Sequence, residues 1–80
     1  MPYYEFWWND RNLEKLSTND VSPEDFENVV CDPLRVESSR RSGQPLAFGY
    51  ASDGRLIACA YEQIDELILR PITAFYIEPR

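Results

Sequence analysis

The sequence predicts an α+β fold in which two short N-terminal helices pack on a four-stranded antiparallel β-sheet. Two N-cap patterns lie in the first third of the chain, and hairpin-type turns separate the apolar runs after Leu34. Two Trp, five Tyr and four Phe can fill a thin two-layer core. A chain of 80 residues cannot be divided into two stable halves. Residues 1–80 are therefore expected to form a single compact domain.

The first helix is expected over about residues 10–17. Asn9 is a good N-cap, and Trp8 and Leu13 are spaced to form a hydrophobic staple around it. The segment that precedes this helix, residues 3–8, is rich in aromatic side chains, which favour strands. It could therefore add a short N-terminal strand to the sheet.

The second helix, at about residues 22–31, has the strongest local signal. Ser22 is a good N-cap, Pro23 suits the first helical position, and Asp25 stands where a capping box places an acid. Pro33 ends the helix. Acidic side chains at its start favour the positive end of the helix dipole, so we interpret them as helix-stabilising and not as a metal site.

Four strands are expected near residues 34–41, 45–51, 55–62 and 67–77. Turn sequences at 42–45, 52–54 and 63–66 separate them. Pro71 lacks a backbone N–H, which predicts that the last strand is an edge strand or is bulged there. One face of the second strand carries only small residues, and the third strand continues this pattern, so a helix could lie close to the sheet; these residues are Ala47, Gly49, Ala51, Ala58 and Ala60.

The net charge of −6 argues against a general nucleic-acid binder, which needs an excess of Lys and Arg. The charges are unevenly distributed, however. Residues 1–34 hold eight acidic side chains and two basic ones, whereas residues 35–80 hold six of each, and all six basic ones are arginines. This arrangement would suit either an anion site or an ordinary solvated surface.

No targeting signal and no apolar run long enough to span a bilayer is present in the sequence, which predicts a cytoplasmic protein without membrane contact. Cys31 and Cys59 have no CxxC spacing, and the sequence contains no His. They are expected to be reduced, buried thiols, with a disulfide between them as the less favoured alternative. We expect no metal and no cofactor.

The order of the motifs resembles the BrnT-type toxins of bacterial toxin–antitoxin systems and their short relatives, whose fold is similar to that of RelE-type ribonucleases. The resemblance covers nearly the whole chain. It rests on Trp8 and Asn12, Val21-Ser22-Pro23-Glu24, Asp32-Pro33, residues 39–45 (SRRSGQP), Phe48-Gly49-Tyr50, Gly54-Arg55-Leu56 and Pro71-Ile72-Thr73-Ala74.

The resemblance implies a metal-independent endoribonuclease that a small antitoxin protein neutralises. Such cleavage needs a base, an acid and fixed cations for the charge on phosphorus. Arg40, Arg41 and Arg55 match arginine-bearing positions of the family and are the candidates for the phosphate clamp. Thr73 and Tyr50 could add hydroxyl contacts. Each of these residues also has a plain structural interpretation, as an exposed turn or strand residue.

The catalytic base is left open by the sequence. Many relatives have a His-Gly pair where this chain has Asn19-Asp20, and arginine is never deprotonated in a protein. The base would be a carboxylate, Glu37 or Glu62, or the phenol of Tyr61. The alternative hypothesis is a non-catalytic protein-interaction module that kept the fold and lost the reactive groups. Self-association through edge strands, as a homodimer, is a third hypothesis.

Overall fold

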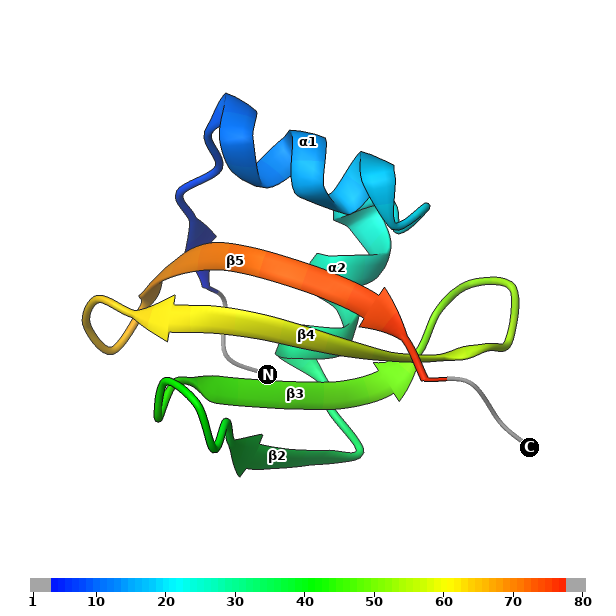
Figure 1. The fold of residues 1–80 in the computed structure, drawn as a ribbon. Helices are drawn as coiled ribbons and strands as arrows, with labels where there is room; N and C mark the ends of the chain where they lie inside the picture. Colours follow the sequence, from blue (N-terminus) through cyan, green and yellow to red (C-terminus); the bar gives the residue numbers. More distant parts are fainter. Residues whose placement is uncertain (1–3, 78–80) are drawn as a thin grey trace.

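The computed structural model describes residues 4–77, which form two helices and five strands. In chain order the elements are β1 (Glu5–Phe6), α1 (Asp10–Thr18), α2 (Pro23–Cys31), β2 (Arg35–Ser38), β3 (Pro45–Tyr50), β4 (Leu56–Gln63) and β5 (Ile68–Tyr76). Figure 1 shows the helices behind and above one twisted sheet. The predicted α+β class is therefore confirmed. Neither helix of the described residues has the length and apolar character that a bilayer crossing requires.

The sheet has the strand order β1-β5-β4-β3-β2. The four strands β2 to β5 pair antiparallel, as predicted, but the N-terminal segment also forms a strand, and β1 pairs parallel to the start of β5. The sheet therefore has five strands and is not purely antiparallel. The first predicted hairpin strand, 34–41, is also too long, because the chain turns at Ser39, whose N–H donates to the carbonyl of Gln44 at 2.8 Å.

Both helices begin at the predicted caps. The Asn9 side chain accepts a hydrogen bond from the N–H of Asn12 at 2.8 Å, and Ser22 Oγ accepts one from the N–H of Asp25 at 3.1 Å. The carboxylate of Asp25 does not close a capping box. It instead accepts hydrogen bonds from the backbone N–H and the hydroxyl of Ser52, at 3.1 and 3.2 Å. The start of α2 is thus tied to the turn between β3 and β4.

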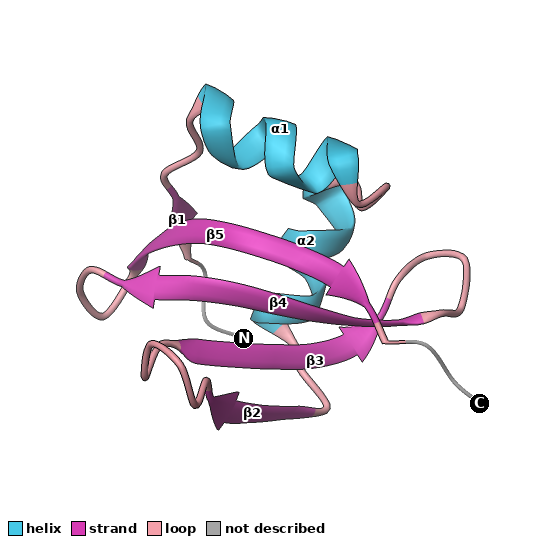
Figure 2. Cartoon of the chain, viewed as in Figure 1, coloured by secondary structure: helices cyan, strands magenta, loops and turns pink. Residues whose placement is uncertain are grey.

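Helix α2 covers one face of the sheet, and small strand residues allow this close packing (Figure 2). A Cβ atom on Gly49 would lie 3.0 Å from Val29 of α2. The strand register places Ala47, Cys59 and Ala74 on this same face. Ala58 and Ala60, which were predicted to continue it, lie on the opposite face, because Ala58 pairs with Phe48 and Ala60 with Leu46.

Helix α1 lies along the part of β5 that β1 does not cover (Figure 1). Two asparagine side chains of this region donate to backbone carbonyls of β5: Asn12 to Ile72 at 3.5 Å and Asn19 to Ala74 at 2.9 Å. The two amides thus bond to β5 carbonyls that a neighbouring strand would otherwise bond to at this edge of the sheet. The predicted irregularity at Pro71 is present, since the register between β4 and β5 shifts there and leaves Ile72 as the extra residue.

Candidate functional site

Arg55 lies at the end of the turn between β3 and β4, where its side chain is held on two sides. Its Nε donates to Asp53 Oδ2 at 2.9 Å, and its guanidinium carbon lies 3.8 Å from the ring centroid of Tyr76. The backbone N–H of Arg55 donates to Asp53 Oδ1 at 3.0 Å. These two hydrogen bonds lower the pKa of Asp53. Arg55 is therefore a positioned cation whose charge is already balanced by a neighbouring carboxylate.

Arg40 and Arg41 lie in the turn between β2 and β3, at the other end of β3 from Arg55. A strand of six residues separates the two turns by about 20 Å. One phosphate group cannot contact both ends. The structure therefore does not bring the three predicted clamp arginines together.

Tyr50 is 61% exposed and borders a shallow hollow at the same end of the sheet as Arg55. Gly54, Arg55, Leu56 and Ile77 line the rest of this hollow. The ring of Tyr50 lies on the sheet face opposite to that of Tyr76, because Tyr50 pairs with Leu56 whereas Tyr76 pairs with Ile57. Tyr50 and Arg55 are neighbours, but the guanidinium is stacked on the other side of the sheet.

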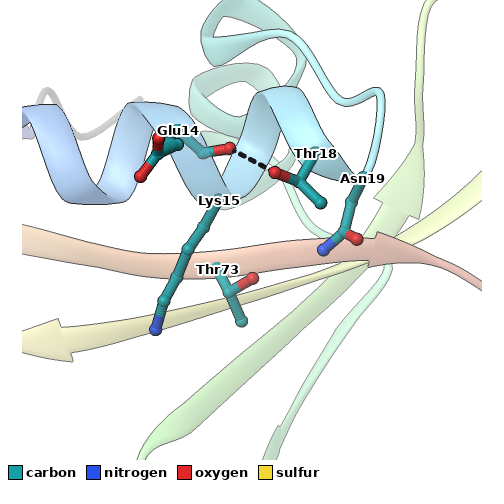
Figure 3. A pocket seen from close by; sticks show the side chains of 5 residues that line it. All are labelled: Glu14, Lys15, Thr18, Asn19 and Thr73. Carbon is teal, nitrogen blue, oxygen red and sulfur yellow. Dashed lines mark hydrogen bonds between the residues drawn. The ribbon is translucent and has the colours of Figure 1, made fainter.

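Thr73 lies in the middle of β5 and borders a hollow of about 360 Å³ between this strand and α1. Figure 3 shows Lys15 extending from α1 across β5 beside Thr73, with Asn19 and Thr18 farther along the helix. Glu14 is the acidic residue of the lining, and its backbone carbonyl accepts a hydrogen bond from Thr18. Lys15, which the sequence did not single out, therefore lines the same hollow as Thr73.

The face of the sheet away from α2, which we call the open face, carries a second pair of reactive side chains. Glu62 of β4 and Arg70 of β5 are cross-strand partners and form an ion pair. Thr73 is on the same face, opposite Ala60. The open face consists of the alternate residues Arg35, Glu37, Leu46, Phe48, Tyr50, Leu56, Ala58, Ala60, Glu62, Arg70, Thr73 and Phe75.

The turn that carries Arg40 and Arg41 lies at the same end of the sheet as Glu62 and Arg70 (Figure 1). This follows from the hairpin order, since β3 begins where β4 ends and β5 starts. Arg40, Arg41 and Arg70 thus lie at this end together with several carboxylates, which are Glu37, Glu62, Asp65 and Glu66. Among the described residues, Arg40 and Arg41 form no ion pair, whereas Arg70 is paired with Glu62.

Two of the three candidate bases remain accessible. Tyr61 is 7% exposed, in the core under α2, and burial raises the pKa of its phenol, so it stays protonated at neutral pH. Glu37 is in an ion pair with Arg35, and Glu62 is in one with Arg70; their side chains are 52% and 34% exposed. Glu62 pairs with Arg70 across the strands and lies two residues along β4 from Ala60, the partner of Thr73. This makes Glu62 the best-placed carboxylate.

The two cysteines are separate thiols, and neither belongs to this cluster. Cys59 is fully buried under α2, and Cys31 is partly exposed at the end of that helix. Within residues 4–77 no three His, Cys, Asp or Glu side chains come together in a way that could hold a metal ion.

Comparisons with family models, with curated proteins and with solved structures found no match to this chain.

Proposed function

We propose that this protein is a BrnT- and RelE-like toxin-family endoribonuclease that cleaves RNA without a metal and that a small antitoxin protein neutralises. The supporting observation is the open face, where a carboxylate, Glu62, forms an ion pair with Arg70, and Thr73 is the next residue of β5 on the same face. No helix of the described residues covers this face (Figure 2). An RNA strand can therefore reach these groups.

In the proposed reaction Glu62 removes the proton of a ribose 2′-hydroxyl, and the 2′-oxygen bonds to the adjacent phosphorus. The bond from phosphorus to the 5′-oxygen breaks, which gives a 2′,3′-cyclic phosphate and a 5′-hydroxyl end. Arg70 balances the negative charge that develops on the phosphoryl oxygens. Lys15, whose side chain lines the same hollow as Thr73, is the candidate that protonates the leaving oxygen.

The separation of the arginines fits an extended polyanion better than a single phosphate. Arg40 and Arg41 lie at the end of the sheet that holds Glu62, and Arg55 lies at the far end of β3. Between them Tyr50 and Phe75 are 61% and 39% exposed on the open face. Exposed aromatic rings stack on the bases of single-stranded RNA, and arginines bind its phosphates.

The test is cleavage of a labelled single-stranded RNA by the purified protein in the presence of EDTA. The native protein should give cyclic phosphate ends, and E62Q should lower the rate by about 100-fold or more, because it removes the base. E66Q is the matched control, since Glu66 is exposed in the turn after β4. Absence of cleavage at every pH and salt concentration, or equal rates for both variants, would contradict the proposal.

The second candidate function is a non-catalytic interaction module of the same fold. It is favoured by the absence of His from the whole sequence and by the carboxylates that already balance Arg55 and Arg70. This module would bind the product of the neighbouring gene without cleaving RNA. Co-purification of the two proteins, together with an inactive native protein in the RNA assay, would support it, and a protein without that partner would exclude it.

A further inference from the structure

Strand β2 is an outer strand of the sheet, and its free edge has an unusual combination of side chains. All four of its residues, Arg35 to Ser38, are exposed. Leu34 and Val36 are 64% and 49% exposed, although both are apolar. Arg35 and Glu37 flank Val36 and form an ion pair with each other at 2.8 Å.

The backbone of β2 offers free hydrogen-bonding groups at this edge. Bonded and non-bonded residue pairs alternate along an antiparallel ladder. The bond from the N–H of Ser39 to the carbonyl of Gln44 continues the ladder between β2 and β3, and it sets the alternation. Arg35 and Glu37 therefore bond to β3, whereas the N–H and C=O groups of Val36 and Ser38 point away from the sheet.

We propose that β2 pairs antiparallel with β2 of a second copy of this chain, in a register centred on Val36. In this register Val36 faces Val36, and the two residues exchange both of their backbone hydrogen bonds. Arg35 faces Glu37 of the second copy, and Glu37 faces its Arg35. The short sequence Arg35-Val36-Glu37 is thus complementary to itself in charge when it is reversed.

This pairing also covers the exposed apolar side chain of Val36. Val36 lies on the helix side of the sheet, because it pairs with Ala47. The two Val36 side chains meet at the centre of the proposed contact. The two-fold axis is perpendicular to the sheet, so both open faces lie on the same side and form one continuous surface.

The competing interpretation is that Arg35 and Glu37 only protect the edge against pairing, as charged residues on edge strands commonly do. A protective edge gains most from side chains of one sign, which repel a second copy. Here opposite charges alternate around an apolar residue, which favours a second copy in one register. The contact is short, so we expect a concentration-dependent monomer–dimer equilibrium and not an obligate dimer.

The test is sedimentation equilibrium of the full chain and three variants. V36P removes the central N–H donor at an edge position that faces solvent, where proline is compatible with a strand. R35E places like charges opposite each other. Both should raise the dimer dissociation constant by about tenfold or more, whereas the charge-swapped R35E/E37R variant should restore most of the affinity.

Circular dichroism of each variant checks that the monomer keeps its fold. Recovery in the swapped variant is the decisive result, because it changes the same positions as the weakened one. A native chain that stays monomeric up to about 1 mM would overturn the proposal. So would a dimer that all three variants leave unchanged, or one that R35E/E37R fails to restore. None of these outcomes depends on RNA cleavage.

Discussion

Side chains alternate between the two faces of the sheet along every strand, but one face is covered by α2 and the other is open. On the face under α2 the strands present Ala47, Gly49, Cys59 and Ala74, which together leave room for the helix. On the open face the same strands present Phe48, Tyr50 and Phe75 as well as Ala58 and Ala60. The small residues under α2 let the helix approach the sheet, and the open face keeps the exposed aromatic and charged groups that a binding site needs.

The largest expected difference between the faces is in the cost of removing an aromatic ring. Phe26 of α2 is fully buried, and it packs against the rings of Phe6 and Trp8 at centroid distances of 6.3 and 5.2 Å. F26A should cost about 3–5 kcal/mol, which approaches the whole free energy of unfolding of about 5 kcal/mol expected for so small a protein. Chemical denaturation would measure this loss.

The matched control on the open face is F75A. Phe75 is 39% exposed, so its removal should lower the free energy of unfolding by about 1 kcal/mol or less. Similar unfolding midpoints for the two variants would mean that the open face is as well packed as the covered one, and the contrast between the faces would fail.

An intermediate effect is expected from one added methyl group at the interface of helix and sheet. In G49A the new Cβ would lie 3.0 and 3.2 Å from the two methyl carbons of Val29. A valine in a helix has one strongly preferred rotamer, so it cannot turn away easily. Overpacking of this kind costs about 1–3 kcal/mol, and the entropic gain of replacing glycine offsets part of it. We expect a net loss of about 1 kcal/mol.

Two further variants separate crowding from other causes. A double-mutant cycle with V29A should show favourable coupling, because the smaller helix residue makes room for the added methyl. A60V adds volume on the open face, where Ala60 is half-buried, and should change stability little. A G49A protein as stable as the native one would show that α2 can move away from β3 at no cost.

Local signals made most of the fold predictable. The caps at Asn9 and Ser22 and the turns that end at Gly43 and Gly54 depend on residues close in sequence, so the helices and hairpins could be assigned from the chain alone. The parallel pairing of β1 with β5 depends on contacts between the two ends of the chain. No local sequence pattern indicates such contacts, so the sequence predicted this strand only as an option.

The candidate site was less predictable because it is defined across strands. Successive hairpin turns lie at opposite ends of a sheet, which separates Arg40 and Arg41 from Arg55. Counting outward from the predicted turn at 63–66 would have placed Glu62 opposite Leu67, whereas the observed register pairs Glu62 with Arg70. The irregularity at Pro71 was predicted from its missing N–H, but the position of α1, which decides what surrounds Thr73, could not be derived without the tertiary structure.

The covered face also protects a thiol, and this protection can be tested at neutral pH without a change in the fold. Cys59 lies on the covered face with no exposed surface, and burial, aided by the charge of Asp25, raises the pKa of its thiol to about 12. At pH 8 a thiol reagent should therefore modify Cys31 in the folded protein and leave Cys59 intact. In denaturant both should react. Rapid modification of Cys59 under native conditions would show that the covered face opens.

The same shift in pKa predicts how stability depends on pH. The thiol of Cys59 loses its proton near pH 8.5 in the unfolded chain and only near 12 in the folded one. The contribution of this thiol to the free energy of unfolding is thus complete below pH 8.5. It declines as the pH rises toward 12, by up to about 1.4 kcal/mol per pH unit. C59A should flatten this decline and C31A much less, because Cys31 is only partly buried. Equal slopes would mean that Cys59 is more hydrated than its place under α2 implies.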